Sequence, residues 1–284
     1  MPRFRTRTTG LWAGFVLGCR QALAYTRSTM LRRSCLILLA ACWPGFGWTQ
    51  SVATVAAASD LKFALEDVAS AFTQQTGHTL RLVFGSSGNF KTQILQGAPF
   101  HLFLSADEGF VHELADAGKT EDRGRPYAVG RIGIVVPPGS LLKADGELKD
   151  LAAALKDGRL QRFAIANPDH APYGARAREA LQHAGLWDAI RPRLVYGENI
   201  SQAAQFATSG STQGGIIAQS LALAPAVAQT GNFQLIPQAW HQPLKQRMVL
   251  VKGAPPAARA FYEHLSQPGA QAVLKRYGFE LPRH

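Results

Sequence analysis

The sequence predicts an α/β protein with two lobes, and three observations lead to this prediction. From residue 52 onward, short apolar runs alternate with stretches whose apolar residues recur at helical spacing, as in α/β proteins. The order strand, helix, strand recurs in both halves of this region. Residues 52–284 also exceed the ~100–150 residues of a typical single domain.

The first series of predicted elements covers residues 52–136. A strand at 52–57 precedes a helix whose apolar face is formed by Leu61, Leu65, Val68, Ala69 and Phe72. A helix through Ile94 and Leu95 ends at Gly97. The other predicted elements are strands at 79–84, 102–104 and 131–136 and a helix at 108–117.

The second series begins after Pro137-Pro138-Gly139. It consists of helices at 148–155, 175–184 and 200–208 and strands at 163–166, 193–196 and 214–217. A strand-like run at 248–251 and helices at 255–265 and 270–277 would return the chain to the first lobe. Two strands would then cross between the lobes as a hinge. We therefore expect one lobe at 52–130 plus 248–284 and the other at 131–247.

The first 50 residues differ in composition from the rest. They contain seven arginines, no Asp or Glu, and all three cysteines. Met30-Leu31-Arg32-Arg33 and the short apolar run at 35–43 are typical of a secretory signal, so we expect 1–50 to be an export leader that is removed. Because 39–42 resembles a lipobox, a lipid anchor at Cys42 is an alternative. Both alternatives place the protein in the periplasm.

The leader also accounts for most of the net charge of +11. The remaining chain carries 23 basic and 19 acidic residues and no cysteine. This near balance does not favour nucleic-acid binding by the folded part. A body without cysteine suits an oxidising compartment and has no soft metal ligand.

Small residues with a hydroxyl group, an amide group or no side chain stand at four predicted helix starts. These starts lie at 57–60, 85–89, 171–174 and 197–201, and none contains Lys or Arg. A helix start has unpaired N–H groups and the positive end of the helix dipole. Several converging starts would hold an anion without a cationic side chain. We therefore predict a binding site and no catalytic centre.

Ser59 and Ser87 both follow a predicted strand. The carboxyl ends of adjacent strands are where open α/β sheets bind ligands, and Gly85 and Gly88 allow close backbone approach. The alternative for Ser59 is an ordinary N-cap whose hydroxyl accepts from residue 61 or 62. Two such turns in one lobe favour the ligand interpretation.

Other chemistries receive less support. A nucleophile elbow needs Gly-x-Ser-x-Gly, and Asn89 occupies the final position after Ser87. A phosphate-binding P-loop motif is missing from the sequence. Asp169 and His170 could suggest a metal pair, but the eight histidines show no His-x-x-x-His spacing. Tyr173 is interpreted as either an aromatic residue at the cleft rim or a surface side chain.

The donor-only character of the predicted site bears on selectivity. Such a pocket favours an oxyanion without a proton, because a protonated one would place its own donor against the donors of the pocket. Molybdate, tungstate and sulfate meet this condition near neutral pH. Hydrogen phosphate keeps one proton, so a receptor for it requires an acceptor such as a carboxylate. Asp60, beside Ser59, could be that acceptor or could simply complement the helix dipole.

Several motifs over 52–281 resemble the periplasmic molybdate-binding proteins of molybdate ABC transporters. They are Ala56-Ala57-Ala58-Ser59, Phe84-Gly85-Ser86-Ser87, Gly97-Ala98-Pro99, Leu102-Phe103-Leu104-Ser105-Ala106-Asp107 and Lys275-Arg276-Tyr277-Gly278-Phe279. The resemblance implies a two-lobed periplasmic-binding-protein-like fold, with a mixed sheet in each lobe and two hinge crossovers. It also implies delivery of one tetrahedral oxyanion to a membrane permease.

The resemblance further implies site residues. Ser59 and Ser87 would each supply a hydroxyl and nearby N–H groups, and Tyr173 and Ile200 would supply backbone N–H groups. Many family members carry a ligand-contacting tyrosine in a Gly-Ile-Val-Tyr segment. Here that segment ends in Ala218, so one side-chain donor is missing.

The sequence therefore leads to one main function and two alternatives. We expect a monomeric, non-enzymatic receptor with high affinity for molybdate and tungstate and no cofactor, whose molybdenum is bound only as molybdate. Ser59, Asp60, Ser87, Tyr173 and Ile200 are the expected oxyanion-binding residues. A sulfate or phosphate receptor of the same fold is the first alternative. A secreted serine hydrolase that uses Ser59 or Ser87 is a remote one.

Overall fold

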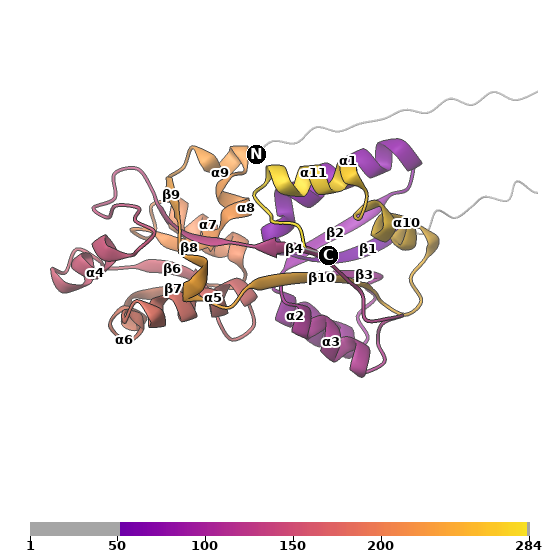
Figure 1. Cartoon of the computed structure of the whole chain (residues 1–284), viewed down its shortest axis with the longest axis horizontal. Helices are drawn as coiled ribbons and strands as arrows, with labels where there is room; N and C mark the ends of the chain where they lie inside the picture. The colour runs from indigo at the N-terminus through magenta and orange to yellow at the C-terminus, as the bar shows by residue number, and fades with distance from the viewer. Residues whose placement is uncertain (1–51, 283–284) are drawn as a thin grey trace, which may run out of the picture. The chain divides into compact units, whose positions relative to one another are not determined.

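Two five-stranded mixed sheets organise residues 52–282, which are the residues that the computed structural model describes (Figure 1). We refer to each sheet with its helices as a lobe. The expected leader at 1–50 and the alternative lipid anchor at Cys42 lie outside the described residues. Between residues 52 and 282, none of the helices has the length and apolar character that crossing a membrane requires.

The first sheet has the strand order β2-β1-β3-β10-β4. Its strands are β1 (Ala53–Ala58), β2 (Leu80–Gly85), β3 (Leu102–Ser105), β4 (Arg125–Gly130) and β10 (Leu244–Leu250). β1 pairs in parallel with β2 and β3, whereas β10 runs antiparallel between β3 and β4. The sheet therefore needs a strand from near the end of the chain to join its early strands.

The second sheet has the strand order β7-β6-β8-β5-β9. Its strands are β5 (Ile132–Val136), β6 (Phe163–Ala166), β7 (Leu194–Gly197), β8 (Gly215–Ala218) and β9 (Asn232–Leu235). β6 is parallel to β7 and β8, and β5 is antiparallel to β8 and β9. Each sheet thus contains one antiparallel strand next to its edge, β10 in the first and β5 in the second.

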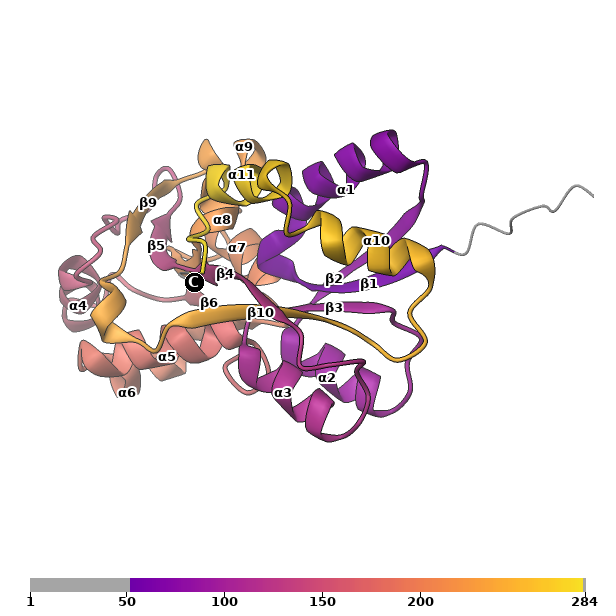
Figure 2. The ribbon, with the colours of Figure 1, turned by 45° about the vertical axis from the view of Figure 1, so that its right-hand side comes forward.

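Helices cover both faces of the first sheet (Figures 1 and 2). One face carries α1 (Lys62–Thr76), α10 (Pro256–His264) and α11 (Pro268–Arg276), which share an apolar core with the sheet. A second apolar cluster lies under α2 (Ser87–Leu95) and α3 (Glu108–Asp116) on the other face. Strands buried on both faces read as continuous apolar runs, which explains the run from Leu102 to Leu104.

The helices of the second lobe share one core with their sheet, except for α9 (Pro225–Ala228), whose Val227 packs against the core of the first sheet. The longer ones are α4 (Lys149–Lys156), α5 (Pro172–His183) and α7 (Ile200–Thr208). The short ones are α6 (Trp187–Ile190), α8 (Gln219–Ala222) and α9 (Pro225–Ala228). Three 3₁₀ turns complete the fold: η1 (Ser59–Leu61), η2 (Arg191–Arg193) and η3 (Gln238–Trp240).

The chain crosses between the sheets twice. Arg131 alone separates β4 from β5, and residues 236–243 connect β9 to β10. Glu280 supports the first crossing, because its backbone exchanges hydrogen bonds of 2.7 and 3.0 Å with Val129 and its side chain pairs with Arg131 at 2.9 Å. The lobe boundaries predicted above stay a prediction.

Most predicted elements are present, but β4 and β9 were not predicted. β4 contains Pro126 and ends at Gly130, two residue types that weaken a strand pattern. β9 is an edge strand whose residues are mostly exposed, so it lacks the apolar alternation of a half-buried strand. The short helices α6, α8 and α9 have four residues each, too few to show a helical period.

Candidate functional site

The four helix starts singled out in the sequence meet around one small cavity. η1 follows β1, α2 follows β2, α5 follows β6 and α7 follows β7, so all four begin at the carboxyl ends of parallel strands. The cavity is lined by Ala58, Ser59, Asp60, Gly85, Ser86, Ser87, Ala106, Ala171, Pro172, Tyr173 and Ile200. No basic residue is among them. The cavity of about 10 Å³ has room for the centre of roughly one water-sized sphere.

All five predicted site residues line this cavity. Ser59, Asp60 and Ser87 come from the first lobe, and Tyr173 and Ile200 come from the second. Each of the five is at most 3% exposed. Their roles toward a ligand stay a prediction, but the structure brings together residues that are up to 141 positions apart in the chain.

Backbone N–H groups supply unused donors at this place. Within the described part of the chain, the N–H groups of Ser59, Ser87, Tyr173 and Ile200 have no hydrogen-bond acceptor. The first N–H groups of a helix have no partner inside the helix, and a buried one costs free energy unless it finds a partner elsewhere. Four such donors at one cavity are therefore suited to an anion.

The hydroxyl group of Ser59 links the two lobes. It donates to Asn199 Oδ1 at 3.1 Å and accepts from the N–H of Ser201 at 3.2 Å. Ser201 in turn donates its hydroxyl to the carbonyl of Ser59 at 2.8 Å. The alternative interpretation, in which Ser59 is the N-cap of its own helix, is therefore wrong. It contacts the start of α7 instead.

Ser87 has a different environment within the first lobe. Its hydroxyl oxygen accepts from the N–H of Ala106 at 3.0 Å. Within residues 52–282 this hydroxyl has no acceptor for its own proton. Ser87 can therefore donate to a ligand while it keeps its contact with Ala106.

Asp60 belongs to a buried polar network that sequence reasoning did not find. Its Oδ2 accepts from the Tyr173 hydroxyl at 2.8 Å and from Gln246 Nε2 at 2.8 Å. Gln246 also donates to the Tyr173 oxygen at 3.1 Å and accepts from the Tyr127 hydroxyl at 2.6 Å. The other carboxyl oxygen, Oδ1, is buried and has no hydrogen-bond partner among the described residues.

Burial raises the pKa of Asp60 from 3.8 to about 6. The hydrogen bonds from Gln246 and Tyr173, and the nearby backbone N–H groups of Asp60 and Leu61, act in the opposite direction and only partly offset burial. Burial also raises the pKa values of Tyr173 and Tyr127 well above 10.0. Both phenols are therefore neutral donors.

Tyr173 is neither a rim aromatic nor a surface side chain, so both interpretations of its ring are wrong. The side chain is 2% exposed and its hydroxyl reaches from α5 into the first lobe. A Cβ atom at Gly130, the last residue of β4, would lie 2.2 Å from this hydroxyl. Only glycine leaves room there for the tyrosine to reach Asp60.

The lobes also contact each other at the rim of the cavity. The N–H of Gly88 donates to the carbonyl of His170 at 3.0 Å, and the Ser86 hydroxyl donates to the same carbonyl. Asn89 Nδ2 donates to Glu198 Oε1 at 2.6 Å. A Cβ atom at Gly88 would come within 2.5 Å of the His170 oxygen. These contacts close the site on the side of α2.

The metal interpretation of Asp169 and His170 finds no support. Among residues 52–282, no group of three or more His, Cys, Asp or Glu side chains could hold an ion. His170 Nδ1 lies 3.0 Å from the Ser86 hydroxyl, and Asp169 forms a turn in which its N–H donates to Asn167. His170 therefore serves the contact between the lobes.

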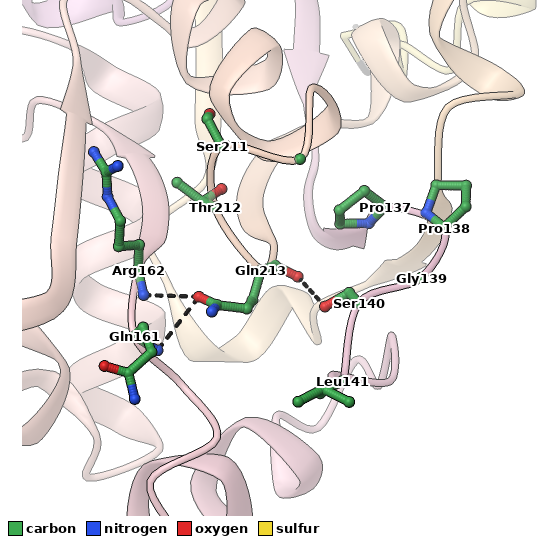
Figure 3. Close-up of a pocket in the computed structure, with 11 residues that line it drawn as sticks. Pro137, Pro138, Gly139, Ser140, Leu141, Gln161, Arg162, Ser211, Thr212 and Gln213 are labelled. Atoms are coloured by element: carbon green, nitrogen blue, oxygen red, sulfur yellow. Dashed lines mark hydrogen bonds between the residues drawn. The ribbon is translucent and has the colours of Figure 1, made fainter.

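A larger cavity lies elsewhere in the second lobe (Figure 3). It has about 310 Å³ and lies where Gln161 and Arg162 lead into β6, at the opposite end of that strand from Tyr173. Its polar groups bind one another: Gln213 Oε1 accepts from the N–H of Arg162 at 2.7 Å, and the Ser140 hydroxyl donates to the Gln213 carbonyl at 2.6 Å. None of the predicted site residues lines it.

Comparison with known proteins agrees with this architecture. Residues 53–280 match the family model of the bacterial extracellular solute-binding proteins. The molybdate-binding protein ModA of Rhodobacter capsulatus is 37% identical over 227 residues, which cover 79% of this chain and 86% of that protein. The Azotobacter vinelandii ModA is 36% identical over 230 residues, covering 80% and 89%.

Solved structures give the same answer for the fold. The periplasmic molybdate-binding protein of Azotobacter vinelandii superposes with a TM-score of 0.74 at 30% identity, covering 81% of this chain and all of that one. The sulfate-binding protein SubI of Mycobacterium tuberculosis, at 18% identity and a TM-score of 0.65, covers 81% and 86% and shares the fold. The chain therefore belongs to the bacterial extracellular solute-binding proteins, in the group that includes the molybdate-binding proteins.

Proposed function

We propose that this protein is an exported receptor that binds molybdate between its two lobes and delivers it to the permease of an ABC transporter. The observation that carries the proposal is a set of N–H groups, at Ser59, Ser87, Tyr173 and Ile200, that have no acceptor among residues 52–282 and surround one cavity without a basic residue. The names of the relatives with 36% and 37% identity support molybdate as the ligand.

The donor set suits an oxyanion that carries no proton. Four N–H groups and the Ser87 hydroxyl can donate, and each charge-assisted hydrogen bond contributes about 1.5–3 kcal/mol. Part of this energy is spent on bringing the lobes together. Tungstate has the same charge and shape, so we propose that it binds as well.

The lobes must stand slightly further apart around a bound oxyanion than they do here. A tetrahedral oxyanion is larger than the single water-sized body that the cavity of about 10 Å³ admits. The two crossings, at Arg131 and at 236–243, are where the chain can bend. A ligand that binds the nearly closed form better than the open form shifts the lobes toward closure, and the permease can recognise that change.

The proposal includes no catalysis. Within the described residues, the hydroxyl groups of Ser59 and Ser87 contact no histidine, so a hydrolase that uses either serine lacks its base. Ser86 does lie near His170, but its hydroxyl donates to the His170 carbonyl. We further propose that the receptor acts as a monomer in the periplasm, either free or anchored through Cys42.

Asp60 is the reason to keep phosphate as a second candidate. A carboxylate in the cavity could accept a hydrogen bond from the protonated oxygen of hydrogen phosphate. Calorimetric titration of the purified protein with molybdate, tungstate, sulfate and phosphate separates the candidates. We expect tight molybdate and tungstate binding and weak phosphate binding. Tight phosphate binding that is lost in Asp60→Asn would overturn the proposal in favour of a phosphate receptor.

A further inference from the structure

The position of Asp60 creates an electrostatic problem for the proposed ligand. Its carboxyl group lines the same cavity as Ser59 and Ser87 and is 1% exposed. An ionised carboxylate beside a dianion in a buried site would repel it, and little solvent is present to screen the two charges. The other polar groups at the cavity are donors, so Asp60 is the exception that needs a physical explanation.

The two oxygens of Asp60 are used unequally. Oδ2 accepts from Tyr173 and Gln246, both at 2.8 Å. Oδ1 is buried and has no partner among residues 52–282. A protonated carboxyl group has one O–H donor and one carbonyl acceptor, so this environment matches a carbonyl oxygen at Oδ2 and leaves Oδ1 for the proton.

We propose that Asp60 takes up one proton from solvent on Oδ1 when the oxyanion binds, and that the resulting O–H donates a hydrogen bond to the oxyanion. The inference rests on the proposed function. The new O–H bond uses the solvent proton, and no other bond is made or broken. Asp60 then becomes one more side-chain donor, and the net charge brought into the site is reduced by one.

The surroundings of Asp60 support proton uptake. Tyr173 on α5, Tyr127 on β4 and Gln246 on β10 face it, and all three are neutral. From α8, Ser220 donates its hydroxyl to the Asp60 carbonyl at 2.8 Å and adds no charge. His170 and Glu198 lie at the rim, where they contact Ser86 and Asn89. Among residues 52–282, no cationic side chain pairs with the carboxylate, and the backbone N–H groups of Asp60 and Leu61 only partly offset its burial. Its pKa is already raised to about 6 before a dianion raises it further.

Calorimetry of the native protein tests this directly. Molybdate is titrated at about pH 8 in buffers with different ionisation enthalpies, and the slope of the apparent enthalpy gives the protons taken up. We expect close to one proton per molybdate, and a Kd that rises about tenfold per pH unit between about pH 7 and 9. A Kd independent of pH, with no proton uptake, would falsify the inference.

The Asp60→Asn variant provides a second, independent measurement. Its amide oxygen can accept from Tyr173 and Gln246, and its NH₂ group can donate permanently from the Oδ1 position. We expect no proton uptake, a flat pH profile, and tighter binding than the native protein at about pH 9. The His170→Gln variant is the control for the rim and should keep the native pH slope. Loss of the slope in that variant would assign the proton to His170.

The outcomes separate the inference from the function on which it rests. Absence of molybdate binding at every pH contradicts the proposed function. Tight molybdate binding without proton uptake contradicts only the role of Asp60. Tight phosphate binding without proton uptake shows that Asp60 stays a carboxylate and accepts a hydrogen bond from the protonated oxygen of the ligand, which also overturns the inference.

Discussion

Two of the cavities in this protein differ in size and, more importantly, in how their polar groups are used. The larger one, of about 310 Å³, is lined by groups such as Gln213 and Ser140 that already bind one another (Figure 3). The smaller one, of about 10 Å³, collects four N–H groups without acceptors in the described chain and a carboxyl oxygen without a partner.

On the proposed function, unused hydrogen-bonding capacity identifies the binding site better than cavity volume does. Buried polar groups are normally paired, and each unpaired one costs about 1–3 kcal/mol. A protein accepts this cost where a ligand later supplies the missing partner. The larger cavity carries no such cost, so nothing in its polar groups calls for a ligand.

The largest effect on binding is expected from a substitution that hinders the lobes from closing over the small cavity. In Gly88→Ala the new Cβ would meet the backbone oxygen of His170 at 2.5 Å, a contact that only a wider separation of the lobes could relieve. We expect a penalty of about 3 kcal/mol, or about a 100-fold loss of molybdate affinity. Isothermal titration calorimetry measures the loss. Gly269→Ala, at an exposed glycine with no atom within 4 Å of the new Cβ, is the matched control and should bind normally.

The second test uses the stability of the ligand-free protein. Because the folded-state pKa of Asp60, about 6, is above its ordinary value of 3.8, the native state holds this proton more tightly than the unfolded state. The free energy of unfolding should therefore fall as the pH rises from about 4 to about 6, by up to about 3 kcal/mol from this group. Above about pH 6, Asp60→Asn should be more stable than the native protein by up to this amount.

Urea unfolding at several pH values measures this difference. Asp188→Asn, at an exposed position on α6, is the control and should follow the native protein throughout. A difference between Asp60→Asn and native that does not change with pH would mean that the carboxyl group is not destabilised by burial. The Asp60 carboxyl group would then not count among the unsatisfied polar groups of the smaller cavity.

A smaller effect is expected from removing one donor of the small cavity. Ser87→Ala loses a hydroxyl that can donate to the ligand, so molybdate affinity should fall by about 1.5–2 kcal/mol, roughly 10- to 30-fold. The unfolding free energy should also fall, because the N–H of Ala106 loses its acceptor at 3.0 Å. Ser70→Ala, on the exposed face of α1, should change neither quantity. Unchanged affinity in Ser87→Ala would reduce Ser87 to a structural residue.

The smallest effect on binding is expected at the larger cavity. Gln213→Ala removes the acceptor for the N–H groups of Gln161 and Arg162, so the unfolding free energy should fall by about 1–2 kcal/mol. Molybdate affinity should stay within about twofold of the native value. A large loss of affinity, measured by the same calorimetric titration, would mean that the two cavities are coupled.

The sequence predicted the parts of the site that depend on local structure. Each helix start follows a strand within a few residues, so small residues such as Ser59 and Ser87 could be recognised from their neighbours. Because these strands are parallel within each sheet, their carboxyl ends lie at the same end of the sheet, and the helix starts lie there together. This reasoning depends only on contacts close in the chain.

The Asp60 network could not be predicted in this way. Gln246 is 186 residues from Asp60, and Tyr173 is 113 residues away. Gln246 lies in β10 between Lys245 and Arg247, before the strand-like run predicted at 248–251, so nothing in its surroundings indicated a buried amide. Gly130 was not distinguished from other glycines. Such contacts follow from how the two lobes meet, which no periodicity or local motif encodes.

The position of β10 between β3 and β4 has a consequence for how the chain assembles. The second sheet uses only residues between Ile132 and Leu235, whereas β4 can join the first sheet only through β10, at residues Leu244–Leu250. A chain emerges from the ribosome or a membrane pore with its amino end first. The second lobe can therefore finish folding before β10 has emerged, whereas the first lobe cannot be completed until β10 is available. The part of the body that appears first is thus the last to be completed.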